Sequence, residues 1–317
     1  MMDHTDILKR AFHITLRYRA LWLFGFFLAL CSGGGGGGGP SGPSPGGEGN
    51  GDLPDFGVPG DFPLNNEQLL IGIAVVFLCL MLFLIAVSVL VQTVTRTSLI
   101  RMVRQIEEAG AVTVREGWHL GWSRRALRVF LISLILGLPF LVLILGLIGV
   151  VGVAILLASG GNSSLTAVGI VGAVILGVFT ILLLILLAVV LAPLRELAWR
   201  EAALNGQTWR ESIGESYSLI RRRLKDVGVL WLIMFGIGLG WGFVSIFLTV
   251  IILIVSVVIG GIPAGLAYLF TQSWIAAAVA GIPLFLLVFI VPLTFATGLY
   301  LIYQSTVWTL AYQELKA

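Results

Sequence analysis

Long apolar runs without Asp, Glu, His, Lys or Arg alternate with short polar segments along the chain. A helix needs about 20 mostly apolar residues to cross the hydrocarbon core of a membrane. Five runs reach that length, at residues 69–95, 129–158, 165–194, 227–260 and 275–310. Each run therefore predicts a transmembrane helix.

A shorter apolar run at residues 20–32 predicts a sixth, first span. Arg17 and Arg19 precede it, and their long side chains can extend to the membrane surface and lengthen the span. A basic segment before a short apolar run is also typical of a cleaved signal peptide. Residues 28–31 (Leu-Ala-Leu-Cys) resemble the lipobox of bacterial lipoproteins, although Leu30 stands where a small residue is usual. Residues 20–32 can therefore form a span, a cleaved segment or a lipidated segment. A span agrees best with an internal repeat of the chain, in which each unit contains two spans.

The Lys and Arg residues all fall in segments that a six-span topology places on one side of the membrane, at residues 9–19, 96–128, 195–225 and 316. The segments on the other side contain none, at residues 32–68, 159–164 and 260–274. Lys and Arg are concentrated in cytoplasmic loops of membrane proteins. We therefore predict a multi-pass protein of the inner (plasma) membrane with both termini in the cytoplasm.

A short motif repeats where the chain enters two of the hairpins. Residues 113–116 and 208–211 share the pattern Thr-x-Arg-Glu, which predicts a capping box at the start of a helix. Gly110 and Gly206 precede these motifs and predict the end of the previous helix. Amphipathic segments with Trp, Tyr and Arg follow, as expected of helices at a membrane surface. The N-terminus begins a shortened third copy, in which Thr5 and Asp6 can cap but the capping Glu is missing.

The predicted fold is an all-α polytopic transmembrane bundle of six spans, arranged as three hairpins with cytoplasmic amphipathic elbow helices. The repeat units cover approximately residues 1–110, 111–206 and 207–317 of a single integral membrane domain. Hydrophobic residues make up 58% and charged residues 11% of the 317 residues, against about 25% charged in soluble domains, which supports a membrane protein. Residues 33–67 predict a flexible Gly- and Pro-rich outer loop, whose acidic half favours a solvated surface over a calcium site.

Residues that carry chemistry are sparse in the predicted spans. His4, His13 and His119 lie in the elbows, and Cys31 and Cys79 lack the spacing of a metal site. We therefore predict no enzyme, and no catalytic, cofactor-binding or metal-binding residues. Because the basic residues follow the topology, we also expect no nucleic-acid partner. Two sets of glycines predict close helix packing, at Gly146, Gly149 and Gly152 and at Gly236, Gly238, Gly240 and Gly242.

The Arg-rich elbows lead into spans that begin with similar strings, Trp22-Leu23-Phe24-Gly25 and the segment around Trp231. This layout resembles uncharacterised bacterial polytopic membrane proteins, which are similar to the membrane domain that accompanies some glycerophosphodiester phosphodiesterases. The catalytic domain of those enzymes has no counterpart here. The resemblance and the composition together predict a non-catalytic membrane module that packs against the lipid bilayer, membrane protein partners or further copies of itself. The alternative is a transporter or permease component for a neutral or lipid-like substrate, with polar groups near Pro292 along its route.

Overall fold

The computed structural model describes residues 4–32, 66–110, 112–159 and 163–316. The regular elements in these ranges are helices, in the order α1 (His4–Arg17), α2 (Ala20–Cys31), α3 (Asn66–Ala109), α4 (Val114–Gly121), α5 (Arg124–Ser159), α6 (Ser163–Arg200), η1 (Glu201–Asn205), α7 (Trp209–Arg222), α8 (Leu224–Thr271) and α9 (Trp274–Lys316). The predicted outer loop at residues 33–67 falls almost entirely outside the described ranges.

Five of the helices are long and apolar enough to cross a membrane: α3, α5, α6, α8 and α9. Long apolar helices are thereby confirmed at all five predicted long runs. The first span is different, because α1 and α2 meet at a bend of 96°. The 12 residues of α2 extend over about 18 Å, which is shorter than a hydrocarbon core of about 30 Å. The sixth crossing therefore stays a prediction.

The far end of α2 lies beside the middle of α3. The Ser88 hydroxyl donates to the Cys31 carbonyl at 3.3 Å, and the Gln92 amide donates to the Ser32 hydroxyl at 3.1 Å. At the near end, the Trp22 indole N–H donates to the Thr15 carbonyl at 2.8 Å and holds α2 against α1 across the bend.

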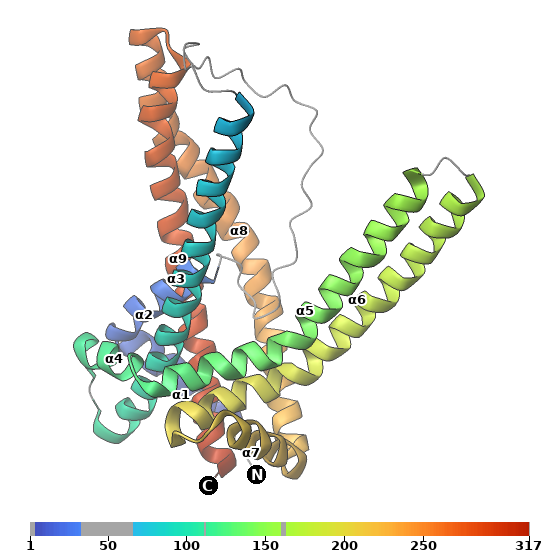
Figure 1. The fold of residues 1–317 in the computed structure, drawn as a ribbon. Coiled ribbons are helices and arrows are strands. Elements are labelled where there is room, and N and C mark those ends of the chain that lie inside the picture. Colours follow the sequence, from blue (N-terminus) through green and yellow to red (C-terminus); the bar gives the residue numbers. More distant parts are fainter. Residues whose placement is uncertain (1–3, 33–65, 111, 160–162, 317) are drawn as a thin grey trace.

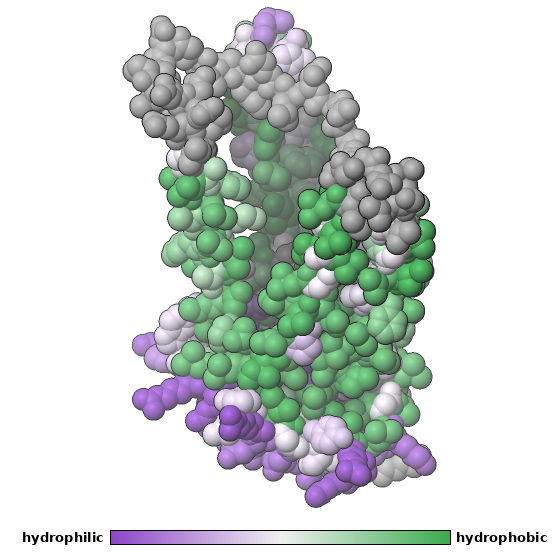
Figure 2. Space-filling view, turned by 45° about the vertical axis from the view of Figure 1, so that its right-hand side comes forward, coloured by the Kyte–Doolittle hydropathy of each residue, from purple (hydrophilic) through white to green (hydrophobic). Residues whose placement is uncertain are grey.

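The helices converge at one end of the molecule, which we call the charged end. Figure 1 shows α1, α4 and α7 at this end, together with the C-terminal end of α9. Figure 2 shows hydrophilic residues gathered below a hydrophobic body. Ile7 of α1 and Leu315 of α9 belong to the same buried core. Farther from this end the α5–α6 hairpin leans away from α3, α8 and α9 (Figure 1).

The apolar lengths of the helices are exposed. The most apolar windows of α3, α5 and α6 bury 0% of their residues, and those of α8 and α9 bury 6% and 11%. Such surfaces are compatible with lipid and incompatible with water. The structure therefore combines a packed core at the charged end with helices whose apolar sides need a membrane.

Both predicted capping boxes are present. The Glu116 amide donates to the Thr113 hydroxyl at 3.4 Å, and the Thr113 amide donates to the Glu116 carboxylate at 3.0 Å. The box at α7 repeats this arrangement, with the Thr208 amide 3.0 Å from the Glu211 carboxylate. These bonds lower the pKa of both carboxyl groups below the ordinary value. The third copy differs, because α1 begins at His4 and places Thr5 inside its first turn.

Of the seven glycines predicted to form packing faces, Gly238 lies close to another helix, since a Cβ there would lie 3.2 Å from the Tyr300 hydroxyl oxygen of α9, and the prediction is wrong for the other six within the single chain. A Cβ atom added at Gly146, Gly149, Gly152, Gly236, Gly240 or Gly242 would meet no atom within 4 Å. The closest helix crossings use other glycines instead. A Cβ at Gly298 would lie 2.8 Å from the Gly25 backbone, and one at Gly281 would lie 2.7 Å from the Gly260 carbonyl oxygen. Glycine spacing along one helix does not reveal which of its faces meets another helix.

Candidate functional site

A cluster of charged side chains lies where α3, α6 and α9 meet at the charged end, with Arg200 buried and the other charged groups partly buried. It consists of Arg96 from α3 and Arg195, Glu196, Trp199 and Arg200 from α6, and we call it the arginine cluster. Arg96 directly follows the apolar run of α3, and Arg195 directly follows that of α6. The helices continue through both points without a break, which carries these charges into the packed core.

The indole ring of Trp199 is the surface on which two arginines of the cluster stack. Its indole N–H donates to the Ser133 hydroxyl of α5 at 2.9 Å, which fixes the plane of the ring. The Arg96 guanidinium carbon lies 3.9 Å from the ring centroid, and that of Arg195 lies 4.9 Å away. Cation–π contacts of desolvated guanidinium groups contribute about 2 kcal/mol. Arg96 is therefore positioned by α6 and, through Ser133, by α5.

Arg200 links α6 to α9 from inside the core, where only 1% of its surface is exposed. Its guanidinium forms an ion pair with Glu196 at 2.7 Å and donates to the Ser305 carbonyl at 3.1 Å. Its Nε atom is buried and has no hydrogen-bond partner. Breaking one side of a buried ion pair costs about 3–5 kcal/mol, so both members are expected to be essential for folding.

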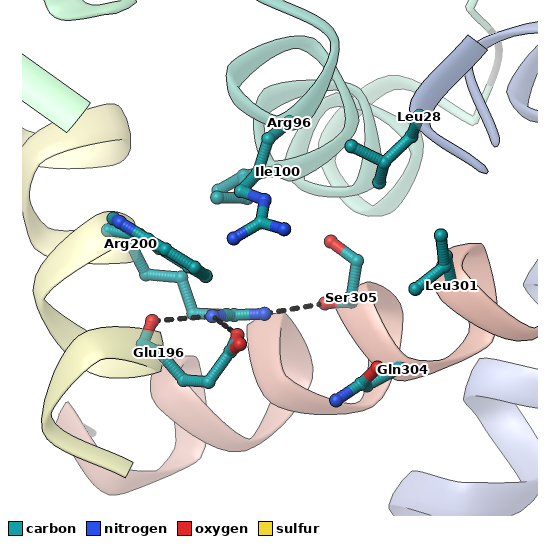
Figure 3. Close-up of a pocket in the computed structure, with 9 residues that line it drawn as sticks. Leu28, Arg96, Ile100, Glu196, Arg200, Leu301, Gln304 and Ser305 are labelled. Carbon is teal, nitrogen blue, oxygen red and sulfur yellow. Dashed lines mark hydrogen bonds and ion pairs between the residues drawn. The ribbon is translucent and has the colours of Figure 1, made fainter. Parts of the chain in front are cut away.

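A small cavity lies between these side chains (Figure 3). Its volume is about 30 Å³, and it is bounded by Arg96, Glu196 and Arg200, by Gln304 and Ser305 of α9, and by apolar residues that include Leu28 of α2. Figure 3 shows the Arg96 guanidinium directed into this space, opposite the Arg200–Ser305 bond. The site therefore presents guanidinium donors to a small, partly open cavity.

A second polar network lies nearer the end of α9. The buried Glu201 carboxylate accepts hydrogen bonds from the Tyr312 hydroxyl and from Lys316, whose Nζ lies 2.8 Å away. Glu201 opens a short π-helical turn, and Asn205 at the end of that turn also donates to its carboxylate. Lys316 also forms an ion pair with Glu215 of α7 at 3.5 Å, so this network joins the end of α9 to η1 and α7.

Two arginines of α5 have specific roles that the sequence pattern did not predict. Arg125 donates to the carbonyls of Ala203 and Leu204 at 3.1 Å each, and Arg128 donates to the carbonyl of Gly206. These carbonyls belong to η1 and to Gly206 just after it, and carbonyls at such a helix end lack partners within the helix. Cationic side chains stabilise such helix ends, so residues interpreted as orientation signals also hold α5 to α6.

An apolar groove opens sideways between α3 and α5, and we call it the lateral groove. Its volume is about 620 Å³, and it is lined chiefly by Leu90, Thr93 and Val94 of α3, Leu127 and Phe130 of α5, and Trp122 and Arg124 at the charged end. Gly121 closes that end, because its Cα approaches α3 so nearly that a Cβ would lie 2.8 Å from the Val94 carbonyl oxygen. A volume of this size is in the range of small-molecule sites.

A model of a family of unknown function, DUF7544, matches residues 8–310. The chain belongs to that family. No curated protein and no solved structure matches the chain. The arginine cluster and the lateral groove both lie inside the residues that match DUF7544.

The residues that the sequence singled out for chemistry do not come together. Cys31 is partly buried in α2 and Cys79 is exposed on α3, and both are free thiols. Within the described ranges, no group of three His, Cys, Asp or Glu side chains is arranged to hold a metal. The arginine cluster was missed because its members were assigned to the cytoplasmic segments. A signal was present in the sequence, since the pair Arg-Glu occurs twice close behind an apolar run, at residues 195–196 and 200–201.

Proposed function

We propose that this DUF7544 protein is a non-catalytic multi-pass membrane module that holds a membrane lipid against its surface. The observation that carries the proposal is the lateral groove. This groove is an apolar trough between α3 and α5, and Trp122 and Arg124 lie at its closed end.

The chemistry of the groove fits one acyl chain and the phosphate of a phospholipid. Leu90 and Leu127 are 50% and 64% exposed, so the trough is open to the surrounding apolar phase. Trp122 is 63% exposed at the end where the polar residues begin. Trp side chains favour the headgroup level of a membrane, and basic side chains there attract anionic lipid phosphates. Arg124 therefore supplies the charge that complements the phosphate.

The proposal includes an orientation. The distribution of Lys and Arg supports a charged end in the cytoplasm of a cell whose inner (plasma) membrane contains the chain. The groove would then take a lipid of the cytoplasmic leaflet. The similarity to the membrane domains that accompany some glycerophosphodiester phosphodiesterases stays a prediction.

Transport of a neutral or lipid-like substrate is the alternative, and two Thr hydroxyls of α8 and α9 that such a route could use favour packing instead. The Thr249 hydroxyl donates to the Ser245 carbonyl at 2.7 Å, and the Thr294 hydroxyl donates to the Ile290 carbonyl. Each therefore bonds its own helix one turn back, as is common for Thr in membrane helices. Pro292 lies inside a helix that continues through it.

The test compares two Leu-to-Trp variants by native mass spectrometry of protein released from mild detergent. Leu90→Trp fills the trough, whereas Leu182→Trp places the same side chain on an exposed part of α6, where Leu182 is 60% exposed. We expect wild type and Leu182→Trp to retain bound phospholipid and Leu90→Trp to lose it. Equal phospholipid retention by both variants would show that the groove is not a lipid site.

A further inference from the structure

An open polar pocket lies between α3 and α4 at the charged end, and we call it the α4 pocket. Its volume is about 350 Å³, and it is lined by Arg101 and Gln105 of α3 and by Arg115, Glu116, His119 and Leu120 of α4. It shares no lining residue with the lateral groove or with the cavity of the arginine cluster. A volume of this size is at the lower end of the range for small-molecule sites.

The α3 side of the α4 pocket is held in position by the protein. The half-buried Arg101 guanidinium donates through one Nη atom to the Leu120 carbonyl at 2.8 Å. This bond fixes the guanidinium at the pocket and leaves its other N–H groups for a ligand. Gln105 lies one helical turn farther along α3 and adds its side-chain amide to the same face.

The α4 side of the pocket presents two basic residues. Arg115 and His119 are one turn apart on α4, so their side chains lie on the same face of the helix. Both are exposed, and within the described ranges Arg115 forms neither a hydrogen bond nor an ion pair. Trp118 and Trp122 stack on each other and Trp118 does not line the pocket, so α4 carries its aromatic and basic residues on different faces.

Glu116 is the one carboxylate among the residues that line the α4 pocket. It accepts the Thr113 amide at 3.0 Å in the capping box, and its bonds to Thr113 lower the pKa of the carboxyl group. Within the described ranges it forms no ion pair with Arg101 or Arg115. The capping box therefore occupies the carboxylate, while the two guanidinium groups stay available to an anion from solution.

The donors of the α4 pocket match the chemistry of a phosphate group. Guanidinium groups bind phosphate oxygens through paired, charge-assisted hydrogen bonds, and a phosphate monoester offers three terminal oxygens to donors from two helices. We propose that the α4 pocket binds the phosphate group of a phosphate monoester. Because the pocket is open, this group can belong to a soluble ester or to a lipid headgroup. The site does not depend on the lateral groove.

The first experiment tests both sources with probes that end in the same group. Calorimetric titration of the purified wild type with glycerol 3-phosphate tests the soluble source, and glycerol is the neutral control. Native mass spectrometry from nanodiscs of phosphatidylcholine and phosphatidic acid tests the lipid source. Leu90→Trp is used there, because it fills the lateral groove and removes lipid bound in it.

Saturable binding of glycerol 3-phosphate would assign the pocket to a soluble ester. Preferential retention of phosphatidic acid by Leu90→Trp would assign it to a lipid headgroup. If neither probe binds, the proposal is wrong, whatever the wild type retains in the lateral groove.

Variants then locate the binding. Arg115→Gln should weaken it about tenfold, as expected for the loss of one charge-assisted hydrogen bond. Arg104→Gln should leave it unchanged, because Arg104 lies on α3 outside the pocket and is paired with Glu108. Glu116→Gln should strengthen it, since Gln keeps an acceptor for the capping box and removes the negative charge.

Arg115→Gln is the decisive variant, because the exposed Arg115 side chain makes no printed bond that folding would lose. Its unfolding temperature should equal that of the wild type, which separates a loss of binding from a loss of structure. Equal affinity of the wild type and Arg115→Gln for the probe that binds would place the binding outside the α4 pocket and overturn the proposal.

Discussion

Gly298→Ala should weaken the attachment of α2 to α9. The two helices cross at Gly25 and Gly298, where each lacks a side chain. A Cβ at position 298 would lie 2.8 Å from the Gly25 carbonyl carbon and oxygen and 2.9 Å from the Phe26 nitrogen. These are backbone atoms, so no side chain can move aside.

The magnitude follows from the separation that the methyl group requires. Carbon atoms in favourable contact lie about 3.5–4.0 Å apart, so the helices must separate by about 0.7–1.2 Å. A gap of that size forfeits at least a quarter to a half of each dispersion contact along the crossing, which includes the fully buried Leu21 and Ile302. Overpacking of this kind typically costs about 1–3 kcal/mol.

The matched control is Gly236→Ala on α8, where an added Cβ meets nothing within 4 Å. The same substitution should there be neutral or slightly stabilising, because Ala favours helix over Gly by up to about 1 kcal/mol. Reversible unfolding in mixed detergent micelles measures both. Equal stability changes for the two variants would refute the assignment of Gly25 and Gly298 as the contact.

Three further outcomes are expected. Thr208→Ala should cost about 1 kcal/mol at the start of α7 and speed hydrogen exchange over residues 211–219, and unchanged exchange there would argue against the cap. The bond from the Thr208 amide lowers the pKa of the Glu211 carboxyl group below its unfolded value of 4.5. The cap is therefore fully formed above pH 4.5 and weakens as the pH falls through the lower pKa of the folded state. The same exchange measurement, taken from about pH 6 to pH 3, should show this loss and no gain. In a variant without native cysteines, an impermeant thiol reagent applied to intact cells should modify cysteines at Ser44 and Ser163 and not at Ser123; modification at Ser123 contradicts the topology.

Features that depend on neighbours in sequence could be predicted. A span is set by a run of apolar residues, and a capping box needs only Thr113 and Glu116, three positions apart. Pairings between distant helices could not be predicted in this way. Nothing near Arg96 in the sequence indicates that it lies against Trp199, and nothing near Gly298 distinguishes it from Gly236. Such contacts depend on the crossing of whole helices, which local patterns leave undetermined.

The three alternatives for residues 20–32 make different demands on the packed core. A cleaved signal segment contributes nothing to the mature fold, yet Leu21, Phe24 and Leu28 of α2 are 0–3% exposed against α3 and α9. Removing α2 would uncover Ile302, leave the backbone at Gly298 without its closest partner, and open the wall of the arginine cavity that Leu28 forms. The burial of α2 therefore favours a segment that is retained in the folded protein. The short length of α2 sets how much of its neighbours it covers. A helix of 12 residues covers the charged end and reaches only as far as Ser88 of α3, so the outer lengths of α3 and α9 stay open to lipid.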